Sequence, residues 1–333
     1  MDVRPVDPFD DELLGRYQDL CRQAELYERP WESIWSHAEL RARFEHPKDT
    51  EHLELFATFD GDEMLAGGFL EVPLEDNLDK GFVHVMVPPA HRRRGVGTLL
   101  LGHLAEAVRA HERTELLVET SYSFGDRHDH PYRRFAEKNG FQEVNVEVVR
   151  VLPLPVDDEL LDRLGSAAAP HHEGYRVETI VGEVPDAYLP SYCRLHNQLG
   201  VDAPTGDVDF EEESLTPETF RETEKRFAAA GTTRVSTVAL LGDAEVVAYT
   251  DLVVRAEETE RANQWGTLVH RDHRGHRLGT AVKVANLREL HGRFPERTEV
   301  VTSNAEVNQN MVDINDRLGF TPVAVLPMFR RFL

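Results

Sequence analysis

The chain has 333 residues, of which 41% are hydrophobic and 29% charged, and its 37 basic and 60 acidic residues give a net charge of −23. So acidic a chain repels nucleic-acid backbones and anionic lipids, and no apolar run approaches the roughly 18 residues of a membrane-spanning helix, so we expect no nucleic-acid or membrane partner. The length suits two α/β domains.

Apolar periodicity predicts, in chain order, a helix at 11–26, strands at 52–60 and 83–87, a helix through 99–108, a strand at 115–123 and a helix that ends at Gly140-Phe141. The second half has the same order, with a helix at 213–229, strands at 234–242 and 298–306, and a helix that ends at Gly319-Phe320. Strands and helices mixed in this order predict an α/β (α+β layered) fold in each half.

The two halves also share sequence. VMVPPAHRRRGVGTLLL at 85–101 aligns without a gap with TLVHRDHRGHRLGTAVK at 267–283, and RRFAEKNGFQEV at 133–144 resembles VDINDRLGFTPV at 312–323. Two blocks that recur in the same order predict a duplicated domain. We expect one domain at 1–155, a linker at 156–174 with a short helix at 157–164, and a second domain at 175–333.

The first aligned block carries an arginine–glycine loop between a strand and a helix. Arg92, Arg93 and Arg94 precede Gly95 and Gly97, just before the helix begins. A helix start presents unpaired N–H groups and the positive end of the helix dipole. Glycines let the backbone approach a ligand closely, and arginines add donors for phosphate oxygens. The loop therefore predicts a pyrophosphate site, although the P-loop and dinucleotide-binding patterns are absent.

The run from Arg92 to Gly97 matches the Arg/Gln-x-x-Gly-x-Gly/Ala signature of the GNAT superfamily of acyl-CoA-dependent N-acyltransferases. Val85-Met86-Val87-Pro88 before it and Lys138-Asn139-Gly140-Phe141 after it match the flanks of that signature. The whole chain resembles a tandem GNAT protein, of the two-domain kind that includes mycothiol synthase. This resemblance implies two domains, each with a mixed central sheet flanked by helices, and acetyl-CoA as the co-substrate.

The resemblance also implies which residues bind coenzyme A. In the first half the backbone of Val85, Met86 and Val87 would pair with the pantetheine arm. The phosphates would lie on Arg92, Arg93, Arg94, Gly95, Val96, Gly97 and Thr98. The corresponding residues of the second half are Leu268, Val269, Arg274, Gly275, His276, Arg277, Leu278, Gly279 and Thr280. Arg277 replaces the first signature glycine, so we expect the first half to be the main coenzyme site.

At the catalytic position both halves depart from the pattern of the family. The family usually has a tyrosine that protonates the leaving thiolate, but that position is Ala136 in the first half and Asn315 in the second. Tyr132 lies one helical turn earlier than Ala136 and is the candidate acid. His84 and Glu119 are the candidate bases that take the proton of the attacking amine.

These observations predict an N-acetyltransferase that acts on a primary amine of a small molecule. The alternatives are a non-catalytic coenzyme A-binding scaffold and a mycothiol synthase-type acetyltransferase. Trp31, Trp35 and Trp265 are candidates to line an acceptor pocket, and the acidic segment 207–213 could attract a cationic amine. The histidine-rich segments 126–130 and 270–276 lack a recognised ligand spacing, so we expect no metal. Cys21 and Cys193 are the only cysteines, so we expect a cytoplasmic protein with reduced thiols. We also expect a monomer or a homodimer.

Overall fold

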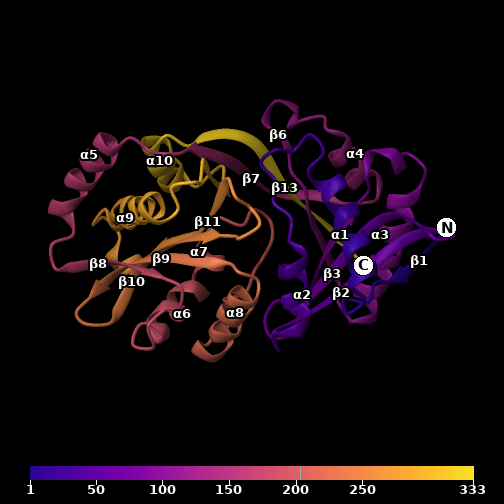
Figure 1. The fold of residues 1–333 in the computed structure, drawn as a ribbon, viewed down its shortest axis with the longest axis horizontal. Coiled ribbons are helices and arrows are strands. Elements are labelled where there is room, and N and C mark those ends of the chain that lie inside the picture. Colours follow the sequence, from indigo (N-terminus) through magenta and orange to yellow (C-terminus); the bar gives the residue numbers. More distant parts are fainter. Residues whose placement is uncertain (203) are drawn as a thin grey trace. The chain divides into compact units, whose positions relative to one another are not determined.

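The computed structural model describes residues 1–202 and 204–333 and divides into two compact units. The first unit comprises residues 1–146, 206–209 and 324–333, and the second comprises the described residues of 147–205 and 210–323. Neither unit is one continuous segment, because residues 206–209 and the end of the last strand both belong to the first unit (Figure 1). Residues 147–155, predicted in the first domain, lie in the second unit, and residues 324–333, predicted in the second domain, lie in the first.

The sheet of the first unit has the order β1-β2-β3-β4-β5-β13. Its strands are β1 (Asp2–Pro5), β2 (Glu51–Asp60), β3 (Glu63–Pro73), β4 (Lys80–Met86), β5 (Glu115–Glu119) and the end of β13 (Thr321–Phe332). All neighbours are antiparallel except β4 and β5, and the short strand β6 (Tyr122–Ser123) also pairs with β13. One parallel pair in an otherwise antiparallel sheet needs a crossover, and a helix between β4 and β5 provides it.

Helices cover both faces of this sheet. α1 (Asp11–Glu25) and α2 (His37–Glu45) share one core with β2 and β3, whereas α3 (Val96–Ala110) and α4 (Pro131–Lys138) share the other. Local signals define the helix starts: the Asp10 side chain caps α1, Ser36 and Glu39 form a capping box on α2, and Pro131 is the first residue of α4.

The sheet of the second unit has the order β7-β12-β11-β10-β9-β8. Its strands are the end of β7 (Gln142–Pro153), β12 (Glu299–Ala305), β11 (Arg261–Val269), β10 (Glu245–Val254), β9 (Thr233–Leu241) and β8 (Tyr175–Val181). Only β11 and β12 are parallel. The second unit thus repeats the strand order and the single parallel pair of the first, which agrees with the repeat in the sequence.

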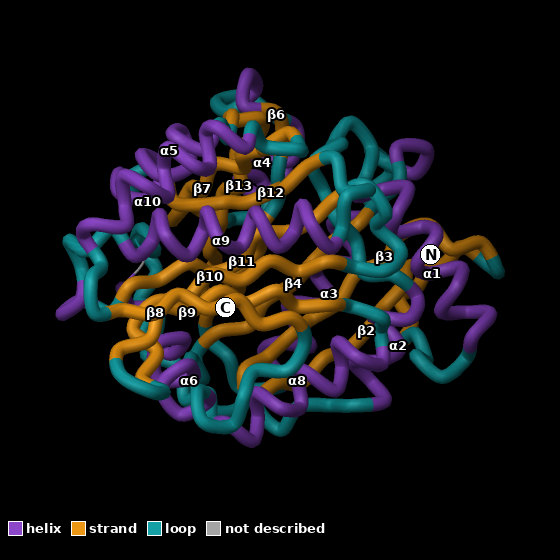
Figure 2. Tube along the Cα trace, turned by 60° about the vertical axis from the view of Figure 1, so that its left-hand side comes forward, coloured by secondary structure: helices purple, strands orange, loops and turns teal. Residues whose placement is uncertain are grey.

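On one face of this second sheet lie α5 (Asp158–Ala168), α9 (Leu278–Arg293) and α10 (Gln309–Leu318), with α9 packed mainly on β9 and β10 (Figure 2). On the other face lie α6 (Leu189–Asn197) and α8 (Pro217–Ala229), and α7 (Leu199–Asp202) follows α6. Single turns of 3-10 helix occur at 89–91, 124–126, 169–171 and 271–273.

The segment 156–174, predicted to be a linker, contains a helix that packs in the core of the second unit. The short helix predicted at 157–164 forms as α5, which extends four residues further, and its Leu161 is buried in the core with Val284 and Leu287 of α9. The Asp157 side chain caps this helix, and the apolar residues Leu161 and Leu164 share one face of it. This segment is therefore part of the second unit.

The core of the second unit contains a chain of buried polar side chains. The Nζ of Lys283 donates to Oδ1 of Asn315 (3.1 Å), and Nδ2 of Asn315 donates to Oδ1 of Asn304 (3.2 Å), which also accepts from Arg150 (3.1 Å). Lys283 is 1% exposed, and burial lowers its pKa to about 7. At neutral pH this lysine is therefore half deprotonated, which is a cost to folding.

We expect Lys283→Met to stabilise the protein at pH 6 to 7 and to flatten its pH dependence. Between pH 7 and the ordinary lysine pKa of 10.5, the unfolded chain keeps a proton that the folded lysine has lost, so the free energy of unfolding rises with pH. A difference of one in pKa corresponds to about 1.4 kcal/mol, so the shift from 10.5 to about 7 costs the folded state on the order of 4–5 kcal/mol. Asn315 loses a donor at a cost of about 1 kcal/mol, so we expect a net stabilisation of roughly 3–4 kcal/mol.

Urea unfolding of the wild type and the variant between pH 6 and 10 measures this effect. Lys225→Met, which replaces an exposed lysine on α8, is the matched control and should leave the pH dependence unchanged. Equal slopes for wild type and Lys283→Met would contradict a lowered pKa for Lys283.

Candidate functional site

The two parallel strands of the first unit separate halfway along β4. β4 and β5 are paired from Lys80↔Glu115 to Phe82↔Leu117, whereas β4 stays paired with β3 as far as Met86↔Gly67. From Val83 onward, no described strand pairs with the side of β4 that faces β5. Backbone N–H and C=O groups on such an edge can hydrogen-bond an extended ligand that contains amides. The predicted pantetheine residues Val85, Met86 and Val87 lie on or directly after this edge.

In the second unit the parallel strands β11 and β12 also separate, but side-chain contacts and an extra residue alter the freed edge. β11 and β12 are paired only from Arg261↔Glu299 to Asn263↔Val301. The Thr302 hydroxyl then donates to the carbonyl of Gln264 (3.2 Å). The register between β10 and β11 also shifts between Thr250↔Thr267 and Leu252↔Gln264, so β11 carries an extra residue there. The second unit therefore uses part of the freed edge for contacts of its own.

The loops that follow β4 and β11 need left-handed backbone at two positions each. In the first unit these are Arg93 (φ 62°) and Gly95 (φ 83°), and in the second they are Gly275 (φ 87°) and Arg277 (φ 53°). The two loops thus have the same pattern with glycine and arginine exchanged. Arg277, which replaces the signature glycine, has a positive φ at a cost of about 1–2 kcal/mol. Arg93 has a positive φ as well, so this cost is the same in the two units.

The start of α3 offers amides at the end of this loop. The first helical hydrogen bond runs from the Leu99 N–H to the Gly95 carbonyl (3.0 Å). In the described residues the N–H groups of Val96, Gly97 and Thr98 have no acceptor. A Cβ on Gly97 would lie 3.3 Å from Val87 and 3.4 Å from Phe135, so glycine lets α3 approach both β4 and α4 closely. Three free amides at the positive end of a helix dipole are groups that can bind an anion.

The three arginines of the first loop have different surroundings. Arg92 points back into the protein: its Nε donates to the Val87 carbonyl (2.8 Å), and its guanidinium lies 5.0 Å from the Tyr27 ring and 5.3 Å from the Tyr132 ring. Arg93 and Arg94 are exposed, and Arg94 makes only a long contact with His91 (3.4 Å) among the described side chains. Arg92 therefore braces the loop, whereas Arg93 and Arg94 can reach an anion.

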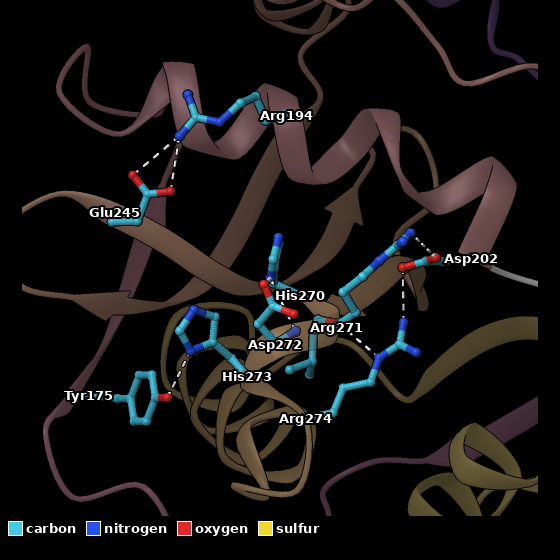
Figure 3. A network of polar contacts seen from close by, with 10 residues as sticks. Tyr175, Arg194, Asp202, Glu245, His270, Arg271, Asp272, His273 and Arg274 are labelled. Carbon is cyan, nitrogen blue, oxygen red and sulfur yellow. Dashed lines mark hydrogen bonds and ion pairs between the residues drawn. The ribbon is translucent and has the colours of Figure 1, made fainter.

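The basic side chains of the second loop have partners within the second unit. Arg271 and Arg274 each donate to one oxygen of the Asp202 carboxylate, both at 2.9 Å, and this side chain is 10% exposed (Figure 3). Arg277 donates to the Ala167 carbonyl (2.9 Å), and His276 contacts the His171 carbonyl (3.0 Å). A carboxylate and two carbonyls thus engage these side chains, whereas Arg93 and Arg94 of the first loop make no ion pair among the described residues.

Tyr132, the predicted acid, lies in the first turn of α4 beside the loop. Its ring is 5.3 Å from the guanidinium of Arg29 and equally far from that of Arg92. The position that carries the family's tyrosine, Ala136, is buried in the apolar core, and its counterpart Asn315 is buried in the polar chain of the second unit. Arg29 was not foreseen, because a lone arginine in a loop gives no sequence signal; it is 5% exposed and paired with Glu25 (2.8 Å).

The two predicted bases differ in their surroundings. His84 stacks on Phe69 with ring centroids 4.2 Å apart. Burial, together with the positive charges of Arg43 and Arg29, lowers the pKa of His84 to about 4, so it is a neutral but weak base. Glu119 is half-buried and ends β5, the strand that separates from β4. Glu119 therefore lies beyond the paired part of β4 and β5, on the strand that separates from β4.

Side chains beyond β5 form a further polar cluster. The Trp31 indole N–H donates to the Ser121 hydroxyl (2.7 Å), which in turn donates to the Glu32 carboxylate. Trp31 was a candidate from the sequence, but Glu32 and Ser121 were not, because they lie 89 residues apart in the chain. Trp35 packs in the core of α1 and α2, and Trp265 contacts Phe227 of α8.

The two histidine-rich segments do not form a convergent ligand set in the described residues. His130 stacks on Tyr122, with ring centroids 4.5 Å apart, and caps α4. His273 contacts the Tyr175 hydroxyl (2.9 Å; Figure 3). Their polar groups therefore have local structural partners.

We expect Gly95→Ala to destabilise the protein by about 1 kcal/mol and to weaken coenzyme A binding, because φ is 83° at this position. A Cβ there meets no atom within 4 Å, so only the backbone conformation opposes it. Gly102→Ala, within α3 and equally open, is the control and should instead stabilise the protein by about 0.5–1 kcal/mol. Chemical denaturation measures both. The same sign of change for the two variants would contradict the conformational argument.

Comparison with known proteins gives three kinds of result. Residues 21–141 match the family model of the acetyltransferase (GNAT) family. The fold is similar to a tandem GNAT protein from the clavulanic acid biosynthesis pathway, solved without acetyl-CoA, with 26% identity, a TM-score of 0.81 and coverage of 99% of this chain and 98% of that one. No curated protein matches the sequence significantly.

Two further solved structures share the fold at lower identity. A GCN5-related N-acetyltransferase from Sphaerobacter thermophilus has 17% identity and a TM-score of 0.60, over 99% of this chain and 95% of that one. A glucosamine N-acetyltransferase region of a fungal multi-domain β-N-acetylglucosaminidase has 14% identity and a TM-score of 0.67, over 99% of this chain and 38% of that one. Among the described residues, no helix combines the length and apolarity needed to cross a membrane.

Proposed function

This chain is a tandem GNAT-family protein, and from that premise we propose that its first unit transfers the acetyl group of acetyl-CoA to a primary amine of a small molecule. The observation that carries the proposal is the contrast between the two loops. Both have the same backbone pattern and exposed arginines, but Arg93 and Arg94 of the first loop make no ion pair among the described residues. In the second, Arg271 and Arg274 both pair with the Asp202 carboxylate.

In this proposal the diphosphate of acetyl-CoA lies on the free amides of Val96, Gly97 and Thr98, with Arg93 and Arg94 as charged donors. The pantetheine arm pairs with the edge of β4 at Val85, Met86 and Val87. This arrangement directs the thioester into the opening between β4 and β5. Binding thus supplies the proximity that brings an amine and the thioester carbonyl together.

The reaction is a direct attack of a neutral amine on the thioester carbon. A backbone N–H at the end of β4, near Val87, stabilises the developing oxyanion. Glu119 takes the proton from the amine, directly or through water, and Tyr132 donates a proton to the leaving thiolate. The guanidinium groups of Arg29 and Arg92 lie over the Tyr132 ring and hold it beside the loop. His84 remains a candidate base, disfavoured by its low pKa.

The acceptor is proposed to be cationic when free in solution. The net charge of −23 attracts a protonated amine. Glu32, Ser121 and Trp31, which lie just beyond β5, offer a carboxylate, a hydroxyl and an aromatic ring for its recognition. A mycothiol synthase-type acceptor is a narrower version of this proposal.

A second candidate function is a coenzyme A-binding scaffold without turnover. The substitution of the family's tyrosine in both units, by Ala136 and Asn315, favours it. Release of free coenzyme A from acetyl-CoA in the presence of polyamines, aminoglycosides and amino sugars distinguishes the two functions. Tight acetyl-CoA binding without amine-dependent turnover would favour the scaffold.

We expect Tyr132→Phe to lower kcat by about 10²-fold while KM for acetyl-CoA changes little, because removal of a general acid affects the transition state more than binding. Tyr27→Phe is the matched control, since Tyr27 contacts Arg92 with its ring as well. An unchanged kcat for Tyr132→Phe would remove Tyr132 from the mechanism, whatever the state of the fold.

We expect the wild type to bind one acetyl-CoA per chain and Asp202→Asn to bind a second, weaker one, because the substitution releases Arg271 and Arg274 from a carboxylate. Isothermal titration calorimetry measures the stoichiometry. Asp243→Asn, on another loop of the second unit, is the control and should leave it at one. Two sites in the wild type would contradict the assignment of the coenzyme to the first unit alone.

A further inference from the structure

Three side chains of the first unit converge at the far end of α3 from the arginine–glycine loop. His52 and Glu54 are two residues apart on β2, so they project from the same face of the sheet. His111 is the C-cap residue of α3. None of the three contributes to the site described above.

The geometry of the three groups is specific. The Nε2 atom of His52 and the Nε2 atom of His111 each lie 2.9 Å from the same oxygen of Glu54, Oε1. The two imidazole rings have centroids 4.9 Å apart. The three potential ligand atoms all lie within 4.8 Å of one another. Zinc bonds of about 2.0–2.2 Å place tetrahedral ligand atoms roughly 3.3 Å apart, so small rotations of these side chains suffice to surround an ion.

The electrostatic setting suits a cation. The Glu54 carboxylate lies between the two imidazole rings and within hydrogen-bonding distance of both. The carboxyl end of α3 adds the negative end of a helix dipole. The side chains of His52, Glu54 and His111 are 43%, 35% and 32% exposed, which leaves a path for an ion and room for water.

The donor set points to a class of metal. Two imidazole nitrogens and one carboxylate oxygen suit borderline transition metals such as Zn²⁺ rather than Mg²⁺ or Ca²⁺, which prefer oxygen alone. Three protein ligands leave a fourth position for water. In the described residues, no other three histidine, cysteine or acidic side chains converge in this way.

We propose that His52, Glu54 and His111 bind one Zn²⁺-type divalent metal ion, which ties β2 to the end of α3. The proposal departs from the sequence-based expectation of no metal, because residues 52, 54 and 111 are too far apart in the chain to form a motif. Gly95 lies 16 residues before His111, which corresponds to about 24 Å along the helix. The metal therefore stabilises the first unit and takes no part in acetyl transfer.

Calorimetry of the full-length protein with ZnCl₂, after removal of metal with EDTA, tests the proposal. We expect one Zn²⁺ per chain. His52→Ala and His111→Ala should each lower the affinity at least about tenfold, since each removes one of three ligands. Glu54→Gln, which retains the shape of the side chain, should weaken binding similarly. Zn²⁺ should also raise the unfolding temperature of the wild type but not of these variants.

His128→Ala is the matched control. This exposed histidine lies in the histidine-rich segment 126–130 of the first unit, and its loss should leave Zn²⁺ affinity unchanged. Circular dichroism verifies that each variant is folded, and Co²⁺ absorption reports the ligand field independently of stability. The proposal is overturned if Zn²⁺ does not bind, if binding survives both histidine substitutions, or if His128→Ala abolishes it. None of these outcomes depends on acetyltransferase activity.

Discussion

The candidate site depends on the separation of β4 from β5 beyond Phe82. Two parallel strands that diverge cannot exchange hydrogen bonds, so the backbone of β4 keeps a free edge inside an otherwise continuous sheet. The chain leaves this edge through a loop with two left-handed residues and enters α3 at once. A strand edge that can pair with amides and a helix start that can bind an anion thereby follow one another within about a dozen residues.

Comparison of the two units separates the backbone geometry of this loop from the environment of its charged side chains. The two loops need positive φ at equivalent positions and place glycine and arginine there in opposite order. Backbone geometry has therefore been retained in the second unit, where Asp202 and two helix-end carbonyls engage the basic side chains. A loop that satisfies its own cations internally gains less from a phosphate, since each charge would first have to leave its partner.

α3 connects the two sites proposed for the first unit. Its amino end, with free amides and nearby arginines, favours an anion, and its carboxyl end, with His111 beside Glu54, favours a cation. The apolar residues between these ends, Val96, Leu100, Leu101, Leu104 and Val108, are buried and fix the helix on the sheet. The packing of one helix thus sets the position of both groups of polar residues.

Sequence alone was enough to predict most of the elements, the duplication and the arginine–glycine loop, because periodicity, glycine placement and repeats are local properties of a chain. It also predicted Tyr132 as a residue of the helix beside the loop. Only the tertiary structure showed that residues 324–333 complete the first unit, that Arg92 turns back towards Tyr27 and Tyr132, and that Asp202 pairs with Arg271 and Arg274. These features join residues far apart in the chain, such as Arg271 and Asp202, separated by 69 positions, or His111 and Glu54, separated by 57. No local pattern encodes such pairs, since they arise only when packing of the apolar faces brings the segments together.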